Sequence, residues 1–525
     1  MRKLSTLFVL LLVSLFCLQV SAQTRYLDEV FSSVAVEEVT YASNISVLTG
    51  SPAPVDLKAD IYTPEGDTAT NRWVMMMCHS GNFLPPIVNG AYNGTKNDSS
   101  ITEMCRRFAK MGYVAISFEY RLGWNPVSPD QNVRTGTILN AAYRGLQDAR
   151  TMVRFLRKSV AEQDNPYGIN DAKIVVGGQG TGGYVSMGAA FLDDFNKIIL
   201  PKFINFDSMP AQVYVDTLLV GNIEGTSQGA INIPNHVGYS SEFNMVFNLG
   251  GALGDSSWID PGDMPAVGFQ TPLDVNAPYA IGDVIVPTTG DIVIGQASGS
   301  FSVAEISNTF GNNQIFVEAG FDDVYTQAAN VNNDGNEGLF PFVRPAVAPG
   351  QLYDCGFGVQ LPAVDEGGPW DWWDQADFIA TWDAATGGDP VPGAVANCSQ
   401  LASNPDMSPE KGRTYLDSVM GYLAPRMNAV LMATSTGGTT SIDNSIKERI
   451  EFGAYPNPVN ETLFVRSSEV IRSVTVFDLA GREVRRINGL RATEVEIPRE
   501  NIESGLYIIQ ADFENTSVTQ KVMWQ

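Results

Sequence analysis

A glycine-rich turn at residues 178–183 (GQGTGG) has the residue types and spacing of a site that could bind phosphate or expose a nucleophile. It follows an apolar run at residues 173–176 and precedes a stretch of small residues, so it should join a strand to a helix. In the pattern G-x-G-x-x-G, here Gly178, Gly180 and Gly183, the backbone approaches the pyrophosphate of a dinucleotide. In the pattern G-x-S-x-G the central residue is a catalytic serine, and Gly180 stands at that position.

The surroundings of this turn favour the serine-type pattern. No clear acidic residue ends a strand about 20 residues later, as the dinucleotide pattern requires. Short motifs stand on both sides of the turn instead. They are HSGNF at residues 79–83, GYVA and EYRLG within residues 112–123, QDAR at residues 147–150, and QTPLD with PY within residues 270–279.

With these motifs, the sequence resembles the α/β-hydrolase carboxylesterases, especially the acetyl- and feruloyl-esterase-like branch, over roughly residues 50–430. The resemblance implies that His79, Ser80 and Gly81 belong to the oxyanion loop and that Asp274 is the triad acid. It also implies the fold class, an α/β-hydrolase doubly wound, mostly parallel sheet with long insertions.

The catalytic triad is incomplete in this sequence. A triad needs a hydroxyl or thiol nucleophile, an imidazole that takes its proton, and a carboxylate that orients the imidazole. Gly180 has no side chain, and the only histidines, His79 and His236, both precede Asp274, whereas the family's histidine follows the acid. We therefore expect catalysis to be impaired. Glycine also relieves the strain of the elbow backbone, so a chain freed from catalysis would drift toward it.

A rewired acyl-transfer site is the alternative. Thr181 is next to the elbow position, but a neighbouring residue on so sharp a turn points elsewhere. Ser80 is nearer to the expected site, yet it lacks an evident base. His236 could reach the pocket from an insertion, although a lone histidine in a loop is more often a surface residue.

Strands and helices alternate along residues 26–433, which is typical of a parallel sheet covered on both faces. Continuous apolar runs predict buried strands, and apolar residues at helical spacing predict helices. The predicted strands are residues 56–61, as an outer antiparallel strand, and residues 72–78, 113–118, 173–176, 244–249 and 265–269. The predicted helices are residues 101–111, residues 137–158, and a helix from the glycine-rich turn to about residue 192. Residues 205–345 and 346–400 should contribute insertions over the carboxyl edge of the sheet.

Two further segments have the residue types of binding sites. Residues 330–335 (NVNNDG) resemble the first half of a calcium loop, but Pro341 stands where the bidentate glutamate belongs, so a surface turn is favoured. Residues 370–377 (WDWWDQAD) place carboxylates among tryptophans, which could form a carbohydrate-binding platform. Packing of these tryptophans over the sheet is the favoured alternative. No cluster of thiolates or histidines indicates zinc, and we expect neither a metal nor a cofactor.

Composition and charge limit the classes of partner. With 525 residues, 44% hydrophobic and 17% charged, the chain is long enough for more than one globular domain. A formal net charge of −25 repels phosphate backbones, so we expect no nucleic-acid partner. No segment after the N-terminus approaches 18 uninterrupted apolar residues, so none should span a membrane in the mature chain.

The N-terminus has the features of a secretory signal peptide over residues 1–22. Arg2 and Lys3 precede an apolar run at residues 4–20, and small residues follow, so the mature chain should begin near Gln23. In an oxidising compartment the four remaining cysteines could form disulfides. Proximity in sequence favours the pairs formed by residues 78 and 105 and by residues 355 and 398, and free buried thiols are the alternative.

The C-terminal segment is predicted to be all-β and to follow a Thr/Ser/Gly-rich linker at residues 434–451. Short strands at residues 462–466, 474–478, 494–497, 507–513 and 518–523 are typical of a small β-sandwich. YPNP at residues 455–458, FDLAGR at 477–482, SGLY at 504–507 and a terminal KV stand in the order and spacing of a known module. Residues 452–525 resemble the C-terminal sorting domain of the type IX secretion system of Bacteroidota. The resemblance implies recognition by that machinery, passage across the outer membrane, and then removal of the tail or attachment at the cell surface.

Together these features predict a secreted or cell-surface carboxylesterase-like protein that lacks its nucleophile and triad histidine and acts by binding a ligand or partner. An ester or a carbohydrate is the expected ligand. One alternative is an active extracellular carboxylic-ester hydrolase with a rewired site. Another is a glycan-binding surface adhesin that uses the hydrolase fold as a scaffold.

Overall fold

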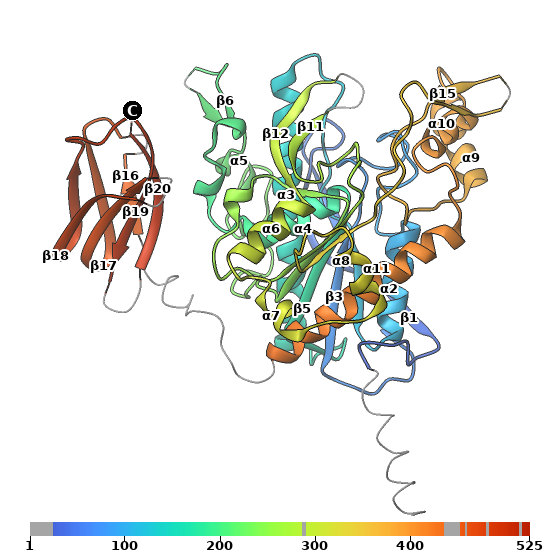
Figure 1. The fold of residues 1–525 in the computed structure, drawn as a ribbon, viewed down its shortest axis with the longest axis horizontal. Coiled ribbons are helices and arrows are strands. Elements are labelled where there is room, and N and C mark those ends of the chain that lie inside the picture. The colour runs from blue at the N-terminus through green and yellow to red at the C-terminus, as the bar shows by residue number, and fades with distance from the viewer. Residues whose placement is uncertain are drawn as a thin grey trace, which may run out of the picture. The chain divides into compact units, whose positions relative to one another are not determined.

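The computed structural model divides the chain into two compact units, Met1–Gly438 and Thr439–Gln525 (Figure 1). The structure describes residues 25–209, 211–285, 290–356, 358–434, 452–456, 459–478, 482–513 and 517–524. The predicted signal peptide and all but the first residue of the predicted linker lie outside the described residues.

An eight-stranded sheet forms the centre of the larger unit, in the order β1-β2-β4-β3-β5-β8-β10-β13. β2 runs antiparallel to β1 and β4, and every other neighbouring pair is parallel. This arrangement confirms the predicted α/β-hydrolase fold with a mostly parallel sheet. The strands are β1 (Val34–Ser46), β2 (Ala53–Pro64), β3 (Arg72–Cys78), β4 (Val114–Phe118), β5 (Ile169–Gln179), β8 (Met245–Leu249), β10 (Ala266–Gln270) and β13 (Leu339–Pro341).

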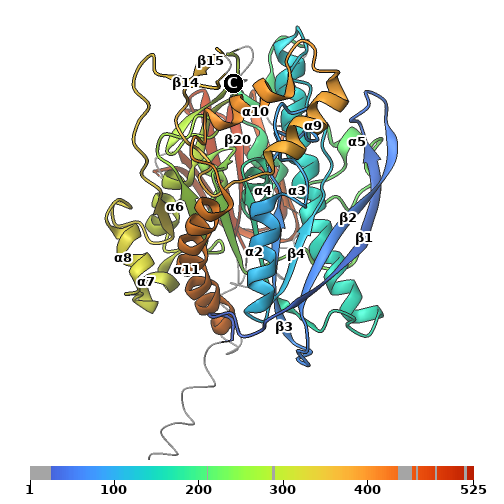
Figure 2. The same cartoon turned by 90° about the vertical axis from the view of Figure 1, so that its right-hand side faces the viewer.

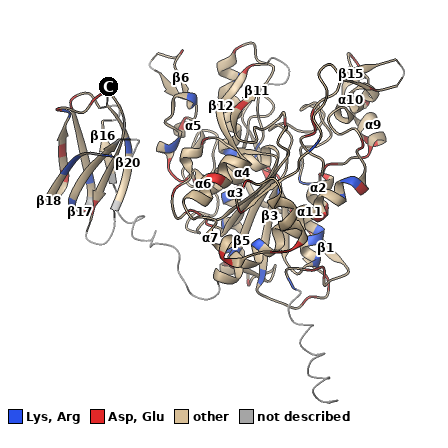
Figure 3. Cartoon of the chain, in the orientation of Figure 1, with Lys and Arg blue, Asp and Glu red and all other residues tan. Residues whose placement is uncertain are grey.

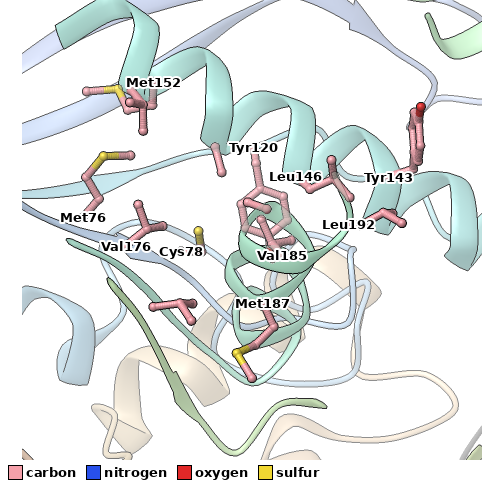
Figure 4. Packing of buried hydrophobic residues seen from close by; sticks show 14 of the residues in the cluster. Met76, Cys78, Tyr120, Tyr143, Leu146, Met152, Val176, Val185, Met187 and Leu192 are labelled. Atoms are coloured by element: carbon pink, nitrogen blue, oxygen red, sulfur yellow. The ribbon is translucent and has the colours of Figure 1, made fainter. Parts of the chain in front are cut away.

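The pleat of β3 divides the buried side chains between two faces of the sheet. Successive side chains of a strand point to opposite faces. Met76 and Cys78 therefore join the cluster that packs against α3 (Gln131–Glu162) and α4 (Thr181–Phe191), as Figure 4 shows from close by. Met75 and Met77 join the cluster under α2 (Ser99–Lys110) and α11 (Pro409–Ala433). α2 and α11 lie side by side on that face in Figure 2. Helices thus cover both faces, as predicted for a doubly wound sheet.

Shorter elements complete the larger unit. A three-stranded sheet has the order β11-β12-β9, and the pairs β14-β15 and β6-β7 form separate ribbons. These strands are β6 (Ile204–Asn205), β7 (Gln212–Val213), β9 (Ala252–Leu253), β11 (Ile281–Ile285), β12 (Ile292–Gly299), β14 (Leu352–Asp354) and β15 (Gln360–Pro362). The remaining helices are α5 (Thr217–Val220), α6 (Ser300–Thr309), α7 (Gln314–Ala319), α8 (Val324–Asn330), α9 (Gln375–Thr386) and α10 (Gly393–Leu401). Among the described helices, none has both the length and the hydropathy that spanning a bilayer requires.

The cysteines follow one predicted pairing and not the other. Cys355 and Cys398 form a disulfide, as predicted. The prediction of a disulfide between Cys78 and Cys105 is wrong, because both are free and buried. The pleat places Cys78 in the cluster beside α3 and α4, whereas Cys105 lies on α2 in the cluster on the opposite face. Proximity in sequence therefore does not bring these two thiols together.

The smaller unit is an antiparallel β-structure with its own apolar core. The strands pair in the order β16-β17-β19-β20, and β18 pairs with β17. They are β16 (Phe452–Tyr455), β17 (Thr462–Asp478), β18 (Glu483–Pro498), β19 (Gly505–Asp512) and β20 (Ser517–Trp524). Two short predicted strands are parts of the single strand β17, whose pairing with β18 is irregular between Arg466 and Ile471.

Candidate functional site

The predicted nucleophile position lies at a sharp turn between β5 and α4 at the carboxyl edge of the sheet. Gly180 has φ 54° and ψ −120°, a conformation that side-chain-bearing residues rarely adopt. Its N–H donates to the carbonyl oxygen of Leu249 at 2.8 Å, which fixes the turn to the end of β8. The backbone therefore has the shape of an elbow, and the residue in it contributes no hydroxyl.

The side chain of Ser80 fills the space that a nucleophile at the elbow would need. A Cβ added to Gly180 would lie 2.3 Å from Ser80 Oγ and 3.1 Å from Ser80 Cβ. Both distances are below ordinary van der Waals contact. Ser80 lies two residues after the end of β3 and is half-buried. Of the residues named as oxyanion-loop candidates, Ser80 thus comes closest to the vacated position.

His79 is buried beneath the loop, and both of its ring nitrogens contact protein groups there. Its Nδ1 is 2.6 Å from the carbonyl oxygen of Ser80, and its Nε2 lies 3.2 Å from Oε2 of Glu119 as an ion-pair contact. The imidazole stacks on Tyr120, whose hydroxyl donates to the carbonyl oxygen of His79 at 2.8 Å. Burial opposes protonation of His79, but the Glu119 carboxylate outweighs it and raises the pKa of His79. Since both ring nitrogens face these groups, His79 is not oriented as a base toward Ser80 Oγ.

His236 does not reach the elbow. Its Nε2 is 2.6 Å from the backbone carbonyl of Tyr41 on β1, and its ring lies 5.7 Å from that of Phe155 on α3. Its pKa is lowered, first by burial and then by the nearby cations Lys158 and Arg154. None of these contacts belongs to the elbow or the loop after β3, so His236 does not supply a base there.

Asp274 lies in the loop after β10, where the triad acid was predicted, and no ion pair among the described residues includes it. A Cβ added to Gly250 would lie 3.5 Å from Asp274 Oδ2 and 3.2 Å from the indole of Trp370. Gly250 comes directly after Leu249, the last residue of β8, whose carbonyl oxygen accepts the hydrogen bond from the Gly180 N–H. The Asp274 carboxylate also packs against Gly367, and it accepts a hydrogen bond from the Asn276 N–H at 2.8 Å. Burial raises the pKa of Asp274 to about 7.

The raised pKa of Asp274 predicts that the stability of the larger unit falls as the pH rises. Between about pH 4 and pH 7 the folded chain holds a proton that the unfolded chain has released, and ionisation of the buried carboxylate then costs free energy. Asp274→Asn removes this penalty, so its advantage in unfolding free energy over wild type should grow by about 2–4 kcal/mol from pH 4.5 to pH 8. Denaturant titrations at several pH values measure the difference. Glu37→Gln, at an exposed position on β1, is the matched control for loss of one carboxylate, and parallel curves for Asp274→Asn and wild type would contradict the prediction.

A polar cluster behind the elbow was not predicted from the sequence. Gln179, the residue before Gly180, donates from Nε2 to Oδ1 of Asp371 at 2.6 Å, and the hydroxyl of Ser100 lies 2.8 Å from both the Gln179 and the Asp371 side-chain oxygens. Burial raises the pKa of Asp371. These contacts join β5, the start of α2 and the segment before α9, and they fix the side chain of Gln179 away from the elbow surface. The one feature of the sequence that could have indicated this cluster is the side-chain amide of Gln179, the second residue of the glycine-rich turn.

Backbone N–H groups in the oxyanion loop and at the elbow are available as hydrogen-bond donors to a ligand. Gly81 has φ 113°, and a Cβ there would lie 2.4 Å from the Cα of Gly94, so the loop needs a glycine. Among the hydrogen bonds of the described residues, none uses the backbone N–H of Gly81 or of Thr181 as donor. The hydroxyl of Thr181 is 3.4 Å from that of Tyr120, which turns it toward the loop under the elbow. The turn can therefore accept a carbonyl or carboxylate oxygen, but no described imidazole stands ready to activate a nucleophile.

The other candidate segments are structural. Trp370, Trp372 and Trp373 are 1%, 8% and 8% exposed, which confirms the packing alternative and leaves no open indole platform. In the calcium-like segment, the side-chain oxygens of Asn330 and Asn333 accept from Asn333 Nδ2 and the Gly335 N–H, so they stabilise a turn. In the part of the chain that the structure describes, no three His, Cys, Asp or Glu residues are grouped to hold a metal ion.

Comparisons with known proteins give two results for the chain. Thermogutta terrifontis esterase 2 phosphorylated by paraoxon is similar at 18% identity, with a TM-score of 0.31, over 60% of this chain and 84% of that one. The propionate-bound form of the same planctomycete esterase is similar at 17% identity and a TM-score of 0.31, over 60% and 85%. No curated protein matches the chain.

The second result concerns the smaller unit. The family model "Secretion system C-terminal sorting domain" matches residues 453–525. The match covers β17 to β20 in full, and it confirms the resemblance found in the sequence. The C-terminal unit of this chain is a type IX secretion C-terminal sorting domain, which implies export to the cell surface or the surroundings.

Proposed function

We propose that the chain is an exported protein with an esterase-like fold that binds a ligand at the vacated elbow and forms no acyl-enzyme intermediate. The observation that carries the proposal is the pair Gly180 and Ser80. The elbow residue has no side chain, and the Ser80 side chain occupies the space in which a nucleophile would turn. Asp274 has no imidazole beside it that could pass a proton.

The remaining donors indicate what the elbow could hold. Free backbone N–H groups at Gly81 and Thr181 and the hydroxyl of Ser80 favour a ligand with a carbonyl or carboxylate oxygen, such as an ester or its acid product. A carbohydrate ligand through the tryptophans has less support, because the indoles are buried. We assign the hydrolase-like domain to residues 26–433 and the linker to residues 434–451. A signal peptide at residues 1–22 and an origin in the Bacteroidota are consistent with the sorting domain.

A rewired esterase is the second candidate, since the Ser80 hydroxyl is the one nearest to the nucleophile position. It lacks a base, because His79 directs its Nδ1 to the Ser80 carbonyl and its Nε2 to Glu119. Initial rates with p-nitrophenyl acetate separate the two candidates. We expect wild type and Ser80→Ala to give the rate of buffer alone. Turnover that wild type shows and Ser80→Ala loses would favour the rewired esterase.

A further inference from the structure

Arg144 on α3 is a buried cation that no described carboxylate neutralises. It is 2% exposed, and its Nε is buried without a hydrogen-bond partner. Among the described residues, its side chain makes one hydrogen bond, from Nη2 to the carbonyl oxygen of Leu122 at 3.3 Å. A guanidinium carries five N–H donors, so most of its hydrogen-bonding capacity is unused.

The other buried arginines near it are paired. Arg121 lies 2.9 Å from Asp148 and also binds that carboxylate through its backbone N–H. Arg150 and Arg154 share Glu224 at 3.2 Å and 3.4 Å and also donate to backbone carbonyls. No ion pair of the described residues includes Arg144, although the chain has a net charge of −25 and acidic residues are scattered along the ribbon of the unit (Figure 3).

Among the described residues around Arg144, none offers it a carboxylate as an ion-pair partner, although the charge of Asp148 acts on it from a distance. A Cβ added to Gly123 would lie 3.0 Å from Arg144 Nη2 and 2.9 Å from Val47, so the guanidinium lies under the loop after β4 and the tip of the β1–β2 hairpin. That tip, residues 47–52 (VLTGSP), contains no acid. Asp148, one turn further along α3, already uses both carboxylate oxygens for Arg121. Burial and the neighbouring Arg121 lower the pKa of Arg144 to about 10, which still leaves it charged at neutral pH.

We propose that Arg144 holds a small monovalent anion beneath Gly123, bound through the unpartnered N–H groups of its guanidinium. An unpaired buried charge is costly, and a bound counter-ion removes most of that cost. The site would also brace the elbow, because the Gly123 N–H donates to the carbonyl oxygen of Phe83 in the loop after β3 at 2.8 Å. A free halide and the carboxylate of a small organic acid share the required chemistry.

Thermal unfolding of the full chain at constant ionic strength tests the site. The reference anion is gluconate, a much larger organic anion, and chloride or acetate replaces gluconate stepwise. We expect the midpoint of the larger unit in wild type to rise by about 2–4 °C and to saturate. A shift with chloride alone assigns a halide site, and a shift with acetate alone assigns a carboxylate site.

Variants separate specific binding from general salt effects. Arg144→Met should unfold at a higher temperature than wild type in gluconate and should not respond specifically to either anion. Arg150→Met removes an arginine that is paired with Glu224. It should be less stable than wild type, but its unfolding midpoint should still rise with the anion. Equal responses of wild type and Arg144→Met, or no saturable response in wild type, would overturn the proposal. If Arg144→Met does not fold, wild-type crystals grown in bromide and in acetate decide the matter: an anomalous peak or acetate density at the Arg144 guanidinium supports the site, and neither ion at the guanidinium refutes it.

Discussion

Gly180→Ser, which would place a hydroxyl at the elbow, is expected to lower the free energy of unfolding of the larger unit by about 2–4 kcal/mol. One part of the loss comes from the backbone, because φ at this residue is 54° and a Cβ is strained there. The other part comes from Ser80, whose Oγ would lie 2.3 Å from the new Cβ. Rotation of the Ser80 hydroxyl can relieve that contact, but the Ser80 Cβ remains at 3.1 Å.

A double-mutant cycle isolates the contribution of Ser80. Ser80→Gly removes the obstructing side chain, so the double variant should recover about 1–2 kcal/mol relative to the sum of the single changes. The backbone strain should remain. Chemical denaturation of the four proteins gives the coupling free energy. Strictly additive effects would mean that Ser80 does not occupy the nucleophile's space. Even the double variant should stay inactive toward esters, since no imidazole accompanies its new serine.

Arg121→Met is the second change with a large expected effect, a loss of about 3–5 kcal/mol. The side chains of Arg121 and Asp148 are 0% and 1% exposed, and Nε of the arginine lies 3.0 Å and 2.9 Å from the two carboxylate oxygens. Removing the arginine leaves a buried carboxylate without its partner. The same arginine donates to the carbonyl oxygen of Ile231 at 3.1 Å, so the loop after β4 also loses a tie to the insertion.

Two companion variants test the cause of this loss. Arg121→Met combined with Asp148→Leu removes both charges and should recover most of the stability, because apolar residues of similar size often replace a buried ion pair at little cost. Lys58→Met breaks an ion pair with Glu38 in which the two side chains are 50% and 47% exposed, and it should change stability far less, because solvent screens such a pair. A loss in Arg121→Met no greater than in Lys58→Met would contradict the assignment.

The buried parallel strands could be predicted from the sequence because each is apolar on both faces. The run at residues 72–78 coincides with β3, and residues 113–118 and 244–249 differ from β4 and β8 by one residue each. β1 was missed because it is an outer strand with many exposed polar residues. α11 was missed because Pro425 and several small residues interrupt its helical pattern, although its buried side packs against α2 and the sheet.

Contacts between residues distant in sequence limited the prediction of the site. Gly180 and Asp274 could be recognised because each belongs to a local motif. Asp371 could not, since it meets Gln179 from 192 residues away and Ser100 from 271 residues away. Whether Ser80 fills the elbow was likewise not decided by spacing, because the answer depends on how the loop after β3 turns above β5.

The structure corrects two predictions that were made from local sequence alone: the disulfide between Cys78 and Cys105, and the two separate strands within β17. Sequence separation alone favoured Cys78 with Cys105, but the alternation of side chains along β3 sends Cys78 to the other face of the sheet. In the smaller unit, two short apolar runs indicated two strands. Both belong to the single strand β17: its pairing with β18 shifts register between Arg466 and Ser473, and β19 pairs only with the second of the two runs.

Intact-mass analysis after exposure to a fluorophosphonate tests the central claim most directly, since this reagent forms a covalent adduct with an activated serine. The full chain is incubated with excess reagent beside an active serine esterase that labels to completion. An elbow without a nucleophile predicts an unchanged mass for this chain. A stoichiometric adduct, mapped to Ser80 or to any other serine or threonine and lost when that residue is replaced by alanine, would contradict the account.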